Sequence, residues 1–153
     1  MKIDITKDEY KCLLDILYIS DWVMNAFSVE ERDDTRVYRD LEQKLLSLAD
    51  GFGLGDLVDL EGRDEIFPSR KFEDESPAFK FIKEYDGEVF WDGLIERLAK
   101  RDFLEKHGKE SLQKIFKDEE LFNELEDMRV KYHNEFVTEG LRRLKILTDP
   151  LSS

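Results

Sequence analysis

The segment between Thr6 and Phe27 constrains the fold more than any other part of the chain. Thr6 and Glu9 have the spacing of a capping box, so we predict that a helix begins at Lys7. Apolar residues then recur at helical spacing in two stripes, one of Tyr10, Leu13, Leu14, Leu17, Tyr18 and Met24 and one of Cys12, Ile16, Ile19, Val23 and Phe27. A helix that is apolar around most of its circumference is usually buried, so we predict that this one lies at the centre of a helical bundle.

The 153 residues of the chain are enough for one domain with a core of ordinary depth. The composition is strongly acidic, with 37 Asp and Glu against 24 Lys and Arg, a net charge of −13. Leu, Ile, Val and Phe nevertheless make up 47 of the 153 residues. That share is well above the roughly 20% below which a highly charged chain is expected to stay disordered. We therefore predict a single globular domain over residues 1–153.

Further helices are predicted from caps, glycines and apolar spacing, over residues 34–51, 77–87, 88–108 and 118–140, with a short one around Leu112, Ile115 and Phe116. In this interpretation Gly51, Gly87, Gly108 and Gly140 each end or interrupt a helix. Residues 51–76 show no sustained period and are predicted to be a long connection, either a functional loop or the site of a short element. Alternation over 2–5 and apolar residues over 141–147 predict a two-stranded β contact between the termini. The predicted class is mostly α, an irregular single-domain bundle of about five helices.

Four polar or aromatic residues stand near the end of the first helix: Tyr18, Asp21, Trp22 and Asn25. A carboxylate at a core position must be paired or hydrogen-bonded, because burying an unpaired charge costs several kcal/mol. One interpretation is a structural ion pair between Asp21 and an arginine, such as Arg36 or Arg143. The other is a pocket for a ligand or a partner, lined by all four residues.

A second candidate site lies on the last predicted helix, where Glu120, Glu124 and Asp127 stand at positions i, i+4 and i+7. Three carboxylates on one helix face have the spacing to share Mg²⁺ or Mn²⁺. They would suit a metal-dependent hydrolase of phosphoesters or nucleotides. The stretch departs from the Glu-Glu-x-x-Glu pattern of all-α nucleotide pyrophosphohydrolases, because Asn123 stands where the third Glu is needed. No complete catalytic set and no cofactor are predicted.

Three stretches carry a weak family likeness: residues 10–27, 90–102 and 132–144. Together they resemble a small bacterial domain family of mostly α structure with no assigned activity. Their shared motifs are packing patterns, so the resemblance implies a fold and assigns no functional residue.

The charge and the missing catalytic motifs together favour a non-enzymatic, cytoplasmic protein-interaction or regulatory domain. An acidic chain is steered toward a protein with a basic surface and is poorly suited to nucleic acid. The N-terminus lacks the apolar region of a signal peptide, and no apolar run is long enough to span a membrane. The alternatives are the Mg²⁺- or Mn²⁺-dependent hydrolase described above and an acidic protein that mimics DNA. The sequence gives no indication of the oligomeric state.

Overall fold

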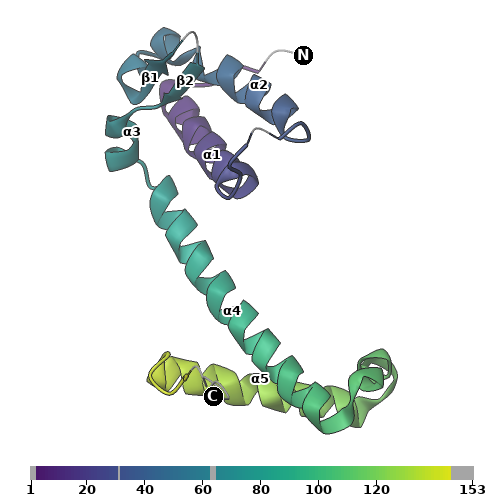
Figure 1. The fold of residues 1–153 in the computed structure, drawn as a ribbon. Coiled ribbons are helices and arrows are strands. Elements are labelled where there is room, and N and C mark those ends of the chain that lie inside the picture. Colours follow the sequence, from purple (N-terminus) through teal and green to yellow (C-terminus); the bar gives the residue numbers. More distant parts are fainter. Residues whose placement is uncertain (1–2, 31, 63–64, 146–153) are drawn as a thin grey trace, which may run out of the picture. The chain divides into compact units, whose positions relative to one another are not determined.

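The computed structural model describes residues 3–30, 32–62 and 65–145 (Figure 1). Of these residues 73% are helical, in five α-helices and four short 3₁₀ helices, and one small antiparallel sheet is present. The predicted mostly α class is therefore confirmed. The chain forms two compact units, residues 1–85 and residues 86–153, which we call unit 1 and unit 2. The assignment of residues 1–153 to a single domain stays a prediction.

The elements alternate long helices with short pieces. Unit 1 contains α1 (Lys7–Asn25), α2 (Arg36–Leu46), the 3₁₀ helices Ala49–Phe52 and Gly55–Leu57, β1 (Val58–Glu61), β2 (Glu65–Pro68), α3 (Arg70–Glu75) and the start of α4 (Ala78–His107). Unit 2 contains the rest of α4, the 3₁₀ helices Lys109–Gln113 and Ile115–Lys117, and α5 (Glu119–Glu139).

Helix α1 begins as predicted, with a complete capping box. The Glu9 amide donates to Thr6 Oγ1 at 3.3 Å, and the Thr6 amide donates to Glu9 Oε2 at 2.7 Å. The prediction that this helix is surrounded on all sides is wrong. Ile16 and Val23 of the second stripe are 60% and 65% exposed, because the core of unit 1 lies along only one side of α1.

The core of unit 1 joins α1 to every later element of the unit up to α3. Its buried residues are Tyr10, Leu14, Leu46, Ala49, Leu54, Leu57 and Phe72. The Tyr10 ring stacks on Phe52, with 4.1 Å between ring centroids. The second helix ends at Leu46 instead of Gly51, and Gly53 takes the positive φ of 66° that closes the following 3₁₀ helix.

The segment 51–76 holds short elements, which was the second of the two predicted alternatives. Strands β1 and β2 pair antiparallel, with Leu60 opposite Ile66, and α3 follows with Ser69 Oγ accepting from the Phe72 amide at 3.3 Å. The predicted β contact between the termini is wrong for residues 3–5 and 141–145, which form no strand. Residues 141–145 instead continue from α5 in turns, as the 3.2 Å bond from the Arg142 amide to the Glu139 carbonyl shows. Residue 2 and residues 146–147 lie outside the described part.

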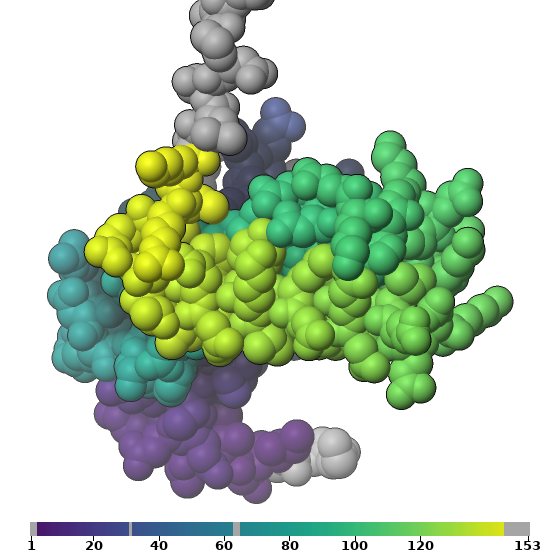
Figure 2. All heavy atoms as spheres, turned by 90° about the horizontal axis from the view of Figure 1, so that it is seen from below, coloured from purple at the N-terminus to yellow at the C-terminus, as the bar shows by residue number. Residues whose placement is uncertain are grey.

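Unit 2 is built on the packing of α5 against the C-terminal part of α4, which Figure 2 shows in green and yellow-green. The buried side chains are Ala99, Phe103, Ile115 and Leu125. The predicted interruption at Gly87 is wrong, because α4 continues through it as one 30-residue helix. The predicted ends at Gly108 and Gly140 are confirmed, and both glycines have positive φ. No helix in the described ranges is both long enough and apolar enough to cross a membrane.

Substitution by alanine of Gly87, inside α4, and of Gly108, just past its end, should change stability in opposite directions. Neither added Cβ would meet an atom within 4 Å, so the backbone alone decides the effect. Gly87→Ala should stabilise by about 0.5–1 kcal/mol, because glycine is unfavourable inside a helix. Gly108→Ala should destabilise by about 1–2 kcal/mol, because its φ is +78°. Urea denaturation followed by circular dichroism measures both, and a stabilising Gly108→Ala would contradict the assigned helix end.

Candidate functional site

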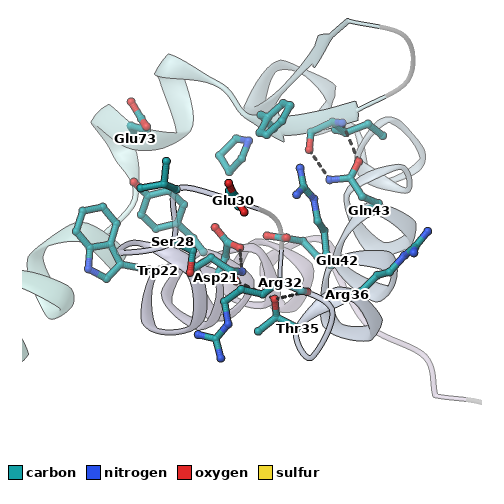
Figure 3. Close-up of a pocket in the computed structure, with 17 residues that line it drawn as sticks. Asp21, Trp22, Ser28, Glu30, Arg32, Thr35, Arg36, Glu42, Gln43 and Glu73 are labelled. Carbon is teal, nitrogen blue, oxygen red and sulfur yellow. Dashed lines mark hydrogen bonds between the residues drawn. The ribbon is translucent and has the colours of Figure 1, made fainter.

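A cavity of about 460 Å³ lies in unit 1 between α1, α2, β2 and α3 (Figure 3). All four residues of the predicted cluster line it, because they recur at i, i+3, i+4 and i+7 along α1: Tyr18, Asp21, Trp22 and Asn25. The loop after α1 adds further lining residues, among them Ser28, Glu30 and Thr35. The structure thus brings the predicted cluster together at one wall of a cavity.

The carboxylate of Asp21 is held by an amide and not by an arginine. Asn25 Nδ2 donates to Asp21 Oδ1 at 2.7 Å, and Thr35 Oγ1 donates to Asn25 Oδ1 at 3.0 Å. Arg143, one of the predicted partners, pairs with Glu135 and Glu139 in unit 2. Within the described residues, Asp21 forms no ion pair, so its charge remains available to the cavity.

Helix α2 supplies the opposite wall through Arg39, Glu42 and Gln43, again at i, i+3 and i+4. Gln43 fixes this wall to the hairpin, because its side-chain amide donates to the Ile66 carbonyl and accepts from the Ile66 amide, both at 2.8 Å. Arg39 Nη2 lies 3.3 Å from Glu65 Oε1 on the same strand. The cavity therefore has walls on two helices and one strand.

The face of α2 that the sequence predicts to be buried is largely exposed in the structure. The spacing of Val37, Leu41, Leu45 and Leu48 in the sequence predicts that these residues face the core, with Glu42 and Gln43 largely outside. In the structure Val37 is 67% and Leu41 52% exposed, and Glu42 and Gln43 line the cavity. Two interactions favour the observed orientation of α2: the hydrogen bonds of Gln43 to the hairpin and the burial of Leu46. Both depend on residues far from α2 in the sequence, so the local apolar pattern does not predict them.

Glu42 has the most strongly shifted pKa among the carboxyl groups of the site, and no sequence motif marks this residue. Its pKa is raised to about 7, mainly by burial and then by the nearby charge of Asp21, while the charge of Arg39 opposes both effects. No hydrogen bond or ion pair satisfies the Glu42 carboxylate within the described part of the chain. Figure 3 shows the carboxylates of Asp21, Glu30 and Glu42 turned toward the same space.

Aromatic rings form another part of the wall, and two of the three arginines that line the cavity are paired elsewhere or turned away from it. The Tyr18 ring packs on Phe72 at 5.4 Å, and the Trp22 ring meets Phe79 edge-on at 6.1 Å. Burial, followed by the charges of Glu73 and Asp21, raises the pKa of Tyr18. Arg32 is held by Asp34 at 2.6 Å, and Figure 3 shows Arg36 extending away from the cavity.

A small groove between α1 and α2 adjoins the cavity and shares Asp21, Arg39 and Glu42 with it. Its other lining residues are Ser20 and the apolar or aromatic side chains of Leu17, Met24, Tyr38 and Leu41. Exposed apolar side chains lie near these positions. Ile16 and Val23 lie four and three positions from the groove residue Ser20, Val37 lies four positions from Leu41, and Leu48 follows the end of α2. The eight apolar or aromatic residues among these are called the α1/α2 apolar face below.

The predicted metal triad lies on α5, but its central carboxylate is already engaged. Glu124 Oε1 accepts from Lys106 Nζ at 2.6 Å and lies 3.1 Å from His107 Nε2. These two contacts lower the pKa of Glu124. Glu120 and Asp127 are exposed on the same helix. No three His, Cys, Asp or Glu side chains are arranged to hold a metal ion over the ranges that the structure describes.

Replacing Glu42 by glutamine should make unit 1 more stable above pH 7. The unfolded carboxyl loses its proton near 4.5 and the folded one near 7, so the wild type loses stability as the pH rises between these values. Glu42→Gln cannot ionise and should be more stable at pH 8 by about 1–3 kcal/mol. Urea denaturation at pH 5 and pH 8, followed by Trp22 fluorescence in a Trp91→Phe background, measures the difference. Asp40→Asn on the exposed side of α2 is the matched control, and an equal gain there would contradict the assignment to Glu42.

Comparison of the chain with protein-family models, with curated proteins and with solved structures finds no match. The resemblance of residues 10–27, 90–102 and 132–144 to a bacterial family therefore stays a prediction.

Proposed function

We propose that this protein is a non-enzymatic interaction domain in which unit 1 binds a basic, amphipathic segment of a partner protein. The observation that carries the proposal is the orientation of α2, which leaves Val37 and Leu41 exposed and turns Glu42 and Gln43 into the cavity. Exposed apolar surface on neighbouring helices is characteristic of protein-interaction sites.

Charge indicates the chemistry of the partner. Unit 1 carries 21 Asp and Glu against 12 Lys and Arg, a net −9 of the total −13. The α1/α2 apolar face borders a cavity into which the carboxylates of Asp21, Glu30 and Glu42 turn. A segment with one apolar side and basic residues beside it matches both surfaces, and opposite charges would accelerate its association.

The mode of binding expected is a helix in a groove, with apolar side chains seated between Met24 and Leu41. Such a role requires no cofactor and no catalytic group. The cytoplasmic location stays a prediction.

Three synthetic 18-residue peptides test the proposal on the full chain. One carries Leu at helical spacing with Arg between, the second has Glu in place of every Arg, and the third is a scrambled form of the first. In a Trp91→Phe background Trp22 is the only tryptophan, so its fluorescence reports on the cavity. The amphipathic basic peptide should bind most tightly, and its affinity should fall with added salt.

Leu41→Ser should weaken the binding of that peptide about tenfold, because the side chain loses its burial at the interface. Leu60→Ser on strand β1 is the matched control, since Leu60 is also exposed but lies outside the groove. Equal affinity of the scrambled peptide, or a large fall in melting temperature of Leu41→Ser alone, would overturn the proposal. The latter result would mean that another part of the same chain covers the face.

A further inference from the structure

We infer that the space between Asp21 and Glu42, against the rings of Tyr18 and Trp22, is a subsite for one guanidinium group, the side-chain end of an arginine in the partner. This inference rests on the proposed function and names the contact that would give it specificity. It concerns the cavity, whereas the peptide segment would lie on the α1/α2 apolar face beside it.

The Glu42 carboxylate is half-buried, so it has lost part of its hydration. A hydrogen bond or an ion pair would compensate that loss. Glu42 accepts no hydrogen bond and forms no ion pair over the described ranges, and it faces the cavity. A bound donor would supply the missing partner.

The composition of the wall also favours a guanidinium group. Asp21 lies opposite Glu42 across the cavity, and its Oδ1 is held by Asn25 at 2.7 Å, which orients the carboxylate. A guanidinium group donates five N–H bonds in one plane and can therefore reach both carboxylates at once. Its flat faces also stack on aromatic rings, and the lining rings of Tyr18, Trp22 and Phe67 offer such surfaces. An ammonium group would satisfy the charge but would not match the plane.

The charged groups around the subsite leave a net negative charge. Asp21 and Tyr18 line the cavity from α1, Arg36, Arg39 and Glu42 from α2, Glu73 from α3, and Glu30 and Arg32 from the loop after α1, which makes four carboxylates against three arginines. Arg39 is the cation that lowers the pKa of Glu42, and its Nη2 also lies 3.3 Å from Glu65 Oε1 on β2. The balance of these groups is acidic, so the cavity attracts one further cation.

Binding should release a proton at neutral pH. Burial and the Asp21 charge hold the Glu42 pKa near 7, so part of the population carries a protonated carboxyl at pH 6.5. A guanidinium group beside it favours the ionised form, and the proton passes to the buffer. The protein thereby exchanges a proton for an organic cation.

Isothermal titration calorimetry at pH 6.5 with N-acetyl-arginine methylamide tests the inference. Repeating the titration in buffers of different ionisation enthalpy counts the protons released. The neutral isostere N-acetyl-citrulline methylamide and the lysine analogue are the comparison probes. We expect the arginine probe to bind with a fraction of a proton released, the lysine probe to bind more weakly, and the citrulline probe not to bind.

Glu42→Gln and Asp21→Asn should each lower the affinity for the arginine probe about tenfold or more, and Glu42→Gln should abolish the proton release. Asp40→Asn removes the same charge from the exposed side of α2 and should change neither quantity. Circular dichroism checks the fold of each variant, and Glu42→Gln is expected to be the more stable protein at high pH. Equal binding of citrulline or lysine, or unchanged affinity in Glu42→Gln, would overturn the inference.

The outcomes separate this inference from the proposed function. If the amphipathic peptide binds wild type and Glu42→Gln equally, the interaction function stands and the guanidinium subsite is wrong. If the arginine probe binds with proton release but no peptide binds, the subsite stands and the proposed partner is wrong.

Discussion

The side chain of Tyr10 is the contact on which the architecture of unit 1 depends. It is fully buried, its ring stacks on Phe52 with an angle of 6° between planes, and its hydroxyl donates to the Leu45 carbonyl at 2.6 Å. One residue therefore links α1 to the end of α2 and to the 3₁₀ helix after it. Because the phenol is satisfied by a carbonyl and not by water, it can occupy the core without the cost of an unpaired polar group.

The contacts of Tyr10 also position the walls of the cavity. With the start of α1 tied to the end of α2, the later turns of α1 face α2 across the cavity. The hydrogen bonds of Gln43 to Ile66 then bring β2 to the third side. Two carboxylates from different helices share one space, and burial together with the charge of Asp21 raises the pKa of Glu42. Two carboxylates held this close together reduce the stability of the fold, and such an arrangement is consistent with the proposed recognition of a cation.

The same orientation explains the exposed apolar face. A helix with one polar and one apolar side normally buries the apolar side, but α2 leaves Val37 and Leu41 exposed while Glu42 and Gln43 line the cavity. Leu46 alone is buried from this helix, and polar contacts to the hairpin hold the rest. The exposed apolar residues of α2 contribute little to the stability of unit 1, so core packing does not explain them. The proposed role in binding does.

The sequence alone determined the local features. The capping box at Thr6, the cap at Asp118 and the helix ends at Gly108 and Gly140 were all predictable, because each depends on hydrogen bonds and sterics within a few residues. The i, i+3, i+4 and i+7 spacing on α1 likewise placed Tyr18, Asp21, Trp22 and Asn25 on one face. Only the tertiary structure decided what lies opposite that face. The orientation of α2, and with it the part played by Glu42, depends on Gln43 meeting Ile66 23 residues later, and no local pattern encodes a contact between elements so far apart.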